Sequence, residues 1–422
     1  MGNNSHTALK IRLAVMSMLQ FGVWGCYLIS LGNFLSNAGL ARQIGWFYAV
    51  QCIVSLFMPA LVGFVADRWL EARRMLGICN FLVAIFFSAA AFYSINSVQI
   101  GFWPLFGLFA CGTAFFMPAI GLSNAIIFKS LRKASVSPES VFPIIRLFGT
   151  LGFIAGMLAV NFARLQSSPY QLLLAAAIGG ILVLYSLSLP ATGLSHRPQN
   201  GMWFNALTLF RQTHTRIFLI FCIFVGVALQ VTNSFGNVFI SQFGSLEAFA
   251  GTWGASNANA IIAVSQISEA VCILLLPFCI RRFGIRNVIL IAIAAWSFRF
   301  LFLALGDTGS GLWLLIASGI VYGIAFDFFN IAGNVYIDRA ADSRSRAGAQ
   351  GLFMAMSSGI GGTLGLVAAQ TAANRLVFST TSPQLRYEGW VNFWLMFALY
   401  ALVLAVLFFI WIKRSSPSGT SK

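Results

Sequence analysis

Twelve apolar stretches, each about twenty residues long or longer, alternate with short polar segments along this 422-residue sequence. A helix needs about 20 apolar residues to cross the hydrocarbon core of a bilayer. Only 9% of the residues are charged, against roughly 25% in ordinary soluble domains. This balance excludes a soluble enzyme, a secreted disulfide scaffold and a disordered chain. The continuous runs also exclude a porin-like barrel, whose strands alternate over about 10 residues.

The apolar runs predict an all-α membrane protein with twelve transmembrane helices. Several runs exceed the length that crossing needs, so those helices should tilt or extend beyond the bilayer. The seven cysteines lie in or beside the runs without metal-ligand spacing, so we expect free thiols and no metal site. The predicted helices are 11–36, 42–66, 75–95, 101–127, 141–163, 170–189, 216–240, 257–280, 288–305, 311–335, 347–372 and 390–412.

The basic residues predict the orientation of these helices. With a cytoplasmic N-terminus, twenty of the 26 lysines and arginines fall in cytoplasmic segments and four in external ones. The positive-inside rule therefore predicts that both termini are cytoplasmic. The net charge of +16 is spread along the chain, whereas a nucleic-acid-binding protein gathers its basic residues on one domain or stripe. We expect no nucleic-acid partner.

A polar, basic segment broken by prolines separates six predicted helices from the next six. We predict an N-terminal six-helix half at 1–189, a cytoplasmic central loop at 190–215 and a C-terminal six-helix half at 216–422. A basic loop follows the second helix of each half. Duplicated six-helix halves of this kind are typical of secondary transporters.

The loop from Gly63 to Arg74 has a glycine, an aspartate and paired arginines at a fixed spacing. It resembles the cytoplasmic loop of the major facilitator superfamily, and Arg281 to Arg286 form a weaker second copy. We interpret the loop from Gly63 to Arg74 as part of a gate, in which Asp67 caps a helix end and pairs with arginines in one conformation only. The gating residues are Asp67, Arg68, Arg73 and Arg74.

Two of the ten acidic residues fall deep inside predicted helices, Glu269 in 257–280 and Asp327 in 311–335. An ionised side chain at mid-membrane costs about 2.5–3.5 kcal/mol even on the insertion scale. Such a residue faces a cavity or a partner, and often carries a proton. For Glu269, a buried ion pair that holds helices together is the structural alternative.

Four predicted helices each place polar or aromatic side chains on one face at helical spacing. A single amide can simply join two helices, at about 0.6 kcal/mol. That alternative does not explain carboxylates, an arginine and rings together. The stripes are Asp327, Asn330 and Asn334; Tyr322, Phe326 and Asn330; Gln266 and Glu269; Gln230, Asn233 and Asn237; and Arg146, Thr150 and Phe153.

These side chains suit an uncharged ligand that has several hydroxyls and a flat ring. Amides donate to and accept from hydroxyls and base edges, and phenylalanine and tyrosine offer stacking faces. Arg146 is interpreted as a cavity residue that holds the substrate or neutralises an acid, with snorkelling at a helix end as the alternative. Arg299 has no polar stripe around it and is assigned no role.

Several segments in order strongly resemble the bacterial nucleoside:proton symporter family of the major facilitator superfamily. They include Gln230 to Asn237, Ser265 to Glu269, Ala325 to Asn330 and Phe142 to Thr150. Ile144, Phe148 and Asn334 depart from the family's pattern. The resemblance implies that ten residues match the family's binding and coupling positions, namely Arg146, Thr150, Phe153, Gln230, Asn233, Gln266, Glu269, Tyr322, Phe326 and Asp327.

The resemblance implies proton-driven uptake of nucleosides, both purine and pyrimidine, across the inner membrane of a Gram-negative bacterium. We expect alternating access, in which two halves rock within the lipid bilayer. Asp327 and Glu269 are the candidate proton carriers, and we favour Asp327. The proton gradient is the expected driving force, with no cofactor, and the protein is expected to be a monomer.

Three alternatives remain at this stage. The first keeps the fold and changes the ligand to a sugar, a drug or another neutral polar solute. The second is a membrane enzyme, but the three histidines lie in terminal or central-loop segments, without a nucleophile, base or metal cluster. The third is a receptor that binds ligand without transporting it.

Overall fold

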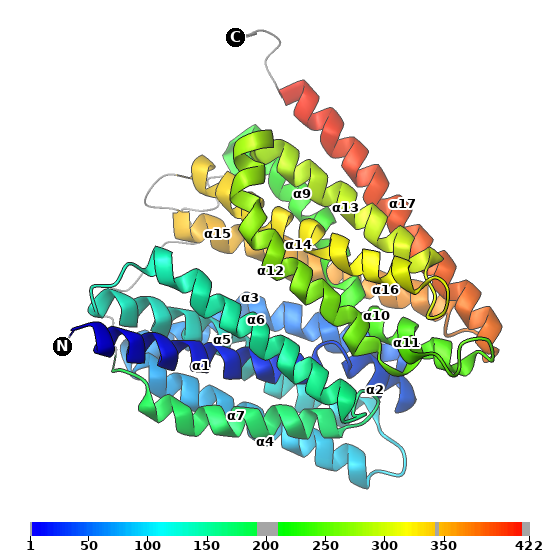
Figure 1. The fold of residues 1–422 in the computed structure, drawn as a ribbon, viewed down its shortest axis with the longest axis horizontal. Coiled ribbons are helices and arrows are strands. Elements are labelled where there is room, and N and C mark those ends of the chain that lie inside the picture. Colours follow the sequence, from blue (N-terminus) through cyan, green and yellow to red (C-terminus); the bar gives the residue numbers. More distant parts are fainter. Residues whose placement is uncertain (1, 192–209, 342–345, 416–422) are drawn as a thin grey trace. The chain divides into compact units, whose positions relative to one another are not determined.

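The computed structural model describes residues 2–191, 210–341 and 346–415, and every regular element within these ranges is helical (Figure 1). The chain divides into two compact units, Met1–Pro198 and Gln199–Lys422. Of the predicted central loop, residues 192–209 lie outside the described ranges.

Twelve helical segments of the described chain are long and apolar enough to cross a membrane, which confirms the predicted number. Most bounds agree with the prediction within a few residues. The largest differences are at two ends: the fourth segment runs to Lys133 rather than 127, and the twelfth begins at Pro383 rather than 390. Polar and basic residues extend both helices beyond their apolar parts, which hydropathy alone does not detect.

In the first unit, a turn after Tyr27, a short helix and a 3₁₀ turn separate the first long helix from the second. Helix α1 packs against α6 and α7, α3 packs against α5, and α4 packs against α5 and α7. The elements are α1 (Gly2–Tyr27), α2 (Leu31–Asn37), η1 (Ala41–Gln43), α3 (Ile44–Arg68), α4 (Ala72–Asn96), α5 (Phe102–Lys133), α6 (Pro138–Phe162) and α7 (Tyr170–Ser188).

The second unit repeats this pattern of contacts. Helix α9 packs against η4 and α16, α12 against α14, and α13 against α14 and α17. The elements are α9 (Thr213–Leu229), α10 (Val231–Gln242), η3 (Phe243–Ser245), α11 (Trp253–Ser256), α12 (Ala258–Phe283), α13 (Ile285–Leu305), α14 (Leu312–Ala340), α15 (Arg346–Met354), the π-helical η4 (Ala355–Gly361), α16 (Gly362–Leu376) and α17 (Pro383–Ser415).

Glycines allow the backbones to touch at equivalent crossings of the two units. A Cβ on Gly152 of α6 would lie 2.0 Å from the Met18 carbonyl oxygen of α1. A Cβ on Gly226 of α9 would lie 2.1 Å from the Ser357 carbonyl oxygen of η4. Any larger residue would push these helices apart, so a close helix crossing helps to fix each unit.

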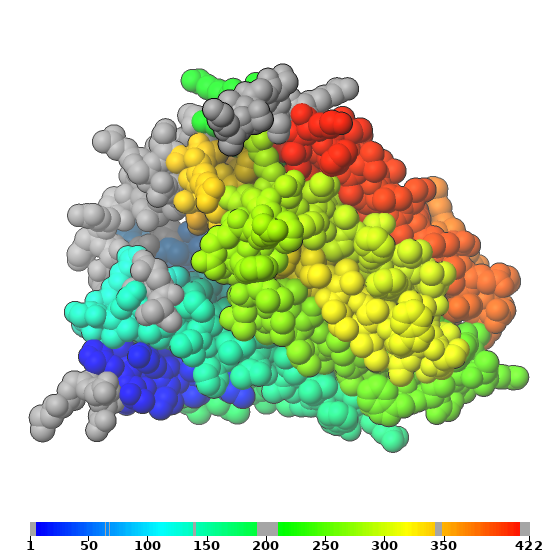
Figure 2. Space-filling model, turned by 45° about the horizontal axis from the view of Figure 1, so that its top comes forward, coloured from blue at the N-terminus to red at the C-terminus, as the bar shows by residue number. Residues whose placement is uncertain are grey.

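Apolar side chains cover the outer faces of the second unit. In Figure 2 the yellow-green and yellow surface of α12 to α14 lies beside the red surface of α17, against which α13 packs. Leu274 of α12 is 78% exposed and Phe298 of α13 is 54% exposed. A surface of this kind is stable against lipid, not against water.

Candidate functional site

The seventh candidate span is broken at Gln230, between α9 and α10. The backbone at Gln230 has φ −101° and ψ −11°, away from regular helix geometry. The Asn233 amide nitrogen donates a hydrogen bond to the Gln230 side-chain oxygen (3.2 Å). Both side chains are half-buried. The break therefore presents two amides together, as their three-residue spacing predicts.

Two rings lie on α14 next to these amides. Tyr322 and Phe326 stack with ring centres 5.2 Å apart and planes inclined by 20°. The Asn233 side chain lies close to the Tyr322 hydroxyl. The four-residue spacing that suggested a shared face is thus a direct stack in the structure.

The two intramembrane acids are close to the same tyrosine. Asp327 is 4% exposed, Glu269 is half-buried, and both interact electrostatically with Tyr322. The reason is a close crossing of α12 and α14, where a Cβ on Gly323 would lie 2.5 Å from the Ser268 carbonyl oxygen. The Ser268 hydroxyl also donates to the Ile320 carbonyl. At this crossing α12, which carries Glu269, and α14, which carries Asp327, are in contact near both carboxylates.

Arg299 is the residue that sequence reasoning missed. It lies on α13, is 5% exposed, and its guanidinium carbon lies 4.2 Å from the centre of the Tyr322 ring. One guanidinium nitrogen donates to the Ser318 carbonyl (2.9 Å) and to the Ser265 hydroxyl (3.3 Å). A charge in an otherwise apolar predicted helix was the only available signal.

The other amides of the predicted stripes in the second unit differ in their contacts. Gln266 is half-buried on α12, whereas Asn330 and Asn334 donate to the carbonyls one turn earlier on α14, at 2.9 and 2.8 Å. Asn237 is fully buried and donates to the Asn259 side chain on α12 (2.6 Å). Asn237 therefore joins two helices, which is the structural alternative for an amide in a stripe.

In the first unit, α6 carries the predicted stripe of Arg146, Thr150 and Phe153. The Arg146 guanidinium carbon lies 4.0 Å from the centre of the Phe21 ring on α1. Phe153 is buried and meets the Trp24 ring edge-on, with ring centres 6.0 Å apart. Arg146 and Thr150 are half-buried, so this stripe faces α1 over at least part of its length.

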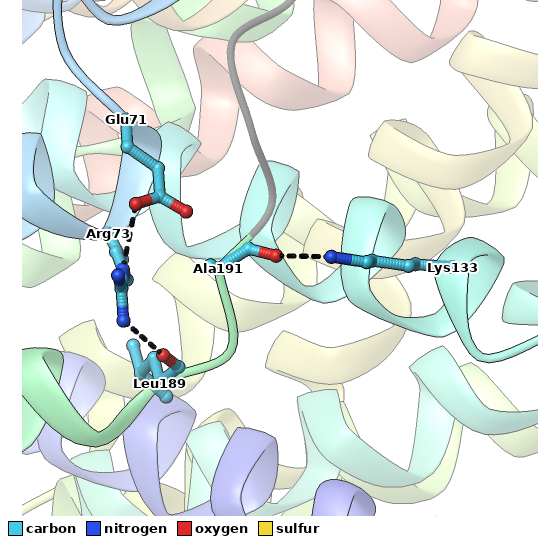
Figure 3. A network of polar contacts seen from close by, with 5 residues as sticks. All are labelled: Glu71, Arg73, Lys133, Leu189 and Ala191. Atoms are coloured by element: carbon cyan, nitrogen blue, oxygen red, sulfur yellow. Dashed lines mark hydrogen bonds and ion pairs between the residues drawn. The ribbon is translucent and has the colours of Figure 1, made fainter.

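The predicted gating loop connects α3 to α4. Arg73 donates to the Glu71 carboxylate (2.9 Å) and to the Leu189 carbonyl after α7 (3.0 Å), and nearby Lys133 donates to the Ala191 carbonyl (3.0 Å) (Figure 3). Arg68 lies over the Trp69 ring at 5.8 Å, and Arg74 is exposed. The side chain of Asp67 lies outside the described part of the structure.

The cluster in the second unit combines carboxylates, donor-acceptor amides, stacked rings and a buried cation. Within the described residues, no group of three or more His, Cys, Asp or Glu side chains is arranged to hold a metal ion. These groups fit recognition of a polar ring-containing solute, and protonation of a carboxylate would change the charge of the cluster.

A family model described as nucleoside H⁺ symporter matches residues 7–417. The chain belongs to this family. The nucleoside permease NupG of Escherichia coli K12 is 38% identical, over 98% of each chain. The xanthosine permease of the same organism is 37% identical, over 96% of each chain. The resemblance seen in the sequence is confirmed.

A crystal structure of the nucleoside transporter NupG superposes with a TM-score of 0.87 at 36% identity, covering 96% of this chain and 99% of that one. This confirms the predicted fold class, a twelve-helix major facilitator fold. The chain is therefore a multi-pass membrane transporter and not an enzyme.

Proposed function

We propose that this chain imports nucleosides together with protons across the bacterial inner membrane. Family membership supports proton-coupled nucleoside transport, and the relatives are named as permeases for nucleosides and for xanthosine. The observation that carries the proposal is the grouping of Asp327 and Glu269 around Tyr322, beside the Gln230 and Asn233 amides.

In this proposal each group has a distinct task. The amides of Gln230, Asn233 and Gln266 bind the hydroxyls and base edge, and Phe326 stacks on the base. Asp327 carries the coupled proton, and Glu269 binds ribose hydroxyls or shares the proton. The substrate-binding set is completed by Tyr322 and Asn330 in the second unit and by Arg146, Thr150 and Phe153 in the first.

The membrane arrangement also belongs to the proposal. The distribution of basic residues supports cytoplasmic termini. We propose that both purine and pyrimidine nucleosides are transported, that the proton gradient is the sole energy source without a cofactor, and that the monomer is the working unit in the bilayer.

Uridine uptake by proteoliposomes, with and without an imposed inward proton gradient, tests this function. We expect accumulation that a protonophore abolishes. Unlabelled uridine and adenosine should compete, and xylose should not. Competition by xylose alone would favour the sugar alternative. Uridine binding without uptake would favour a receptor.

A further inference from the structure

A pocket of about 470 Å³ lies at one end of α12, α13 and α14, away from the proposed nucleoside residues. The turn between α12 and α13 forms one wall, and the last turn of α14 forms the other. Arg286 and Arg339 contribute two positive charges from opposite walls. The lining is Phe283, Gly284, Ile285, Arg286, Asn287, Tyr336, Arg339 and Ala340.

The basic turn between α3 and α4 in the first unit contains an acidic residue, whereas the equivalent turn between α12 and α13 contains none. In the first unit Arg73 pairs with Glu71 at 2.9 Å, whereas residues 280–287 contain three arginines and no acid. Within the described residues, neither Arg286 nor Arg339 forms an ion pair. Asp338 does not line the pocket, and its carboxylate accepts a hydrogen bond from Gln350 (3.4 Å).

Further donors face the same pocket. Residues Ile285 to Asn287 form the first turn of the 21-residue α13, where backbone N–H groups lack helical partners and the helix dipole is positive. The Arg286 side chain lies close to the Tyr336 hydroxyl across the pocket. Two guanidinium groups, a hydroxyl and a helix N-terminus together match a phosphate group.

We infer that this pocket binds the phosphate of an anionic phospholipid headgroup. Phosphate esters also occur as soluble metabolites, but two features favour a lipid. The pocket lies where three candidate spans end, and Phe283 beside it is 49% exposed. Basic pockets between helix ends are suited to anionic headgroups. The inference is independent of which solute the protein transports.

Native mass spectrometry of the purified full-length protein in detergent tests the inference. Phosphatidylglycerol and phosphatidylcholine are titrated separately. We expect one tightly bound phosphatidylglycerol, with about tenfold preference over phosphatidylcholine, which the two arginines provide. R286Q/R339Q should lose this preference. R281Q/R282Q, which removes the same charge from the same turn but outside the pocket, should keep it.

Three results would overturn the inference: no preference in the unmodified protein, equal loss in both double variants, or tight binding of glycerol 3-phosphate without lipid preference. The last result would assign the pocket to a soluble phosphate ester. Thermal melting shows whether each variant is folded. If R286Q/R339Q is not, R339Q alone provides the test, because Arg339 is exposed at the end of α14.

Discussion

The guanidinium carbon of Arg299 on α13 lies 4.2 Å from the centre of the Tyr322 ring on α14. Tyr322 in turn stacks on Phe326, so a buried cation supports the pair of rings in the proposed binding site. The same guanidinium reaches Ser265 on α12. Arg299 is therefore a positioning residue that joins three helices and fixes the tyrosine, and a desolvated contact of this kind is worth about 2 kcal/mol.

Replacing Arg299 by lysine should impair both stability and substrate affinity. Lysine keeps the charge but loses the planar group that bonds the Ser318 carbonyl and lies over the ring. We expect a loss of about 1.5–3 kcal/mol of stability, the usual range for a charged hydrogen bond, seen as a lower Tm, and a higher KM for uridine uptake.

The matched control is Ser318→Ala. Arg299 donates to the Ser318 carbonyl, which this variant retains, although it loses the bond from the Ser318 hydroxyl to the Arg299 carbonyl (3.0 Å). Its Tm should fall less than that of Arg299→Lys, and KM should stay near that of the unmodified protein. An unchanged KM in Arg299→Lys would contradict the proposed role of Arg299 as a positioning residue.

Replacing Asp327 by asparagine should separate transport from coupling. The amide preserves shape but cannot take up and release a proton. We expect Asp327→Asn to exchange labelled for unlabelled uridine but to lose accumulation under a gradient of one pH unit, which sustains about tenfold accumulation for one proton per nucleoside. The measurement is counterflow beside gradient-driven uptake in one proteoliposome preparation.

Glu269→Gln is the comparison for this experiment. If Glu269 mainly binds ribose hydroxyls, this variant should raise KM yet still concentrate uridine. Accumulation by Asp327→Asn together with its loss in Glu269→Gln would reverse the two assignments.

Hydropathy and helical spacing predicted the parts of this protein that depend on local sequence. The number of spans follows from apolar run lengths, and the four-residue step from Tyr322 to Phe326 appears as a stack. Arg299 was missed because one of its partners is a backbone carbonyl, which leaves no trace in the sequence. Asn237 matched the spacing of Gln230 and Asn233, but the face of one helix does not reveal which neighbour it meets.

Replacing Gly323 by alanine should shift the positions of Asp327 and Glu269, although neither residue is itself changed. The added Cβ would lie 2.5 Å from the Ser268 carbonyl oxygen, so α12 and α14 must separate, at a typical cost of about 1–3 kcal/mol. We expect a lower Tm and weaker uridine uptake. Gly236→Ala is the control, because its Cβ would meet its nearest neighbour at 3.9 Å. Equal behaviour of the two variants would show that this crossing does not position the site.

Asn233 and Asn237 lie one turn apart on α10 and should respond differently to alanine. Asn233 bonds Gln230 and is half-buried in the proposed site, so Asn233→Ala should raise KM for uridine with little change in Tm. Asn237 donates to the buried Asn259 side-chain oxygen, and Asn237→Ala removes this buried hydrogen bond, at a cost of about 1–3 kcal/mol. It should therefore lower Tm while the folded fraction keeps its KM. If Asn237→Ala raises KM as strongly as Asn233→Ala, the proposed site must extend along the whole polar face of α10.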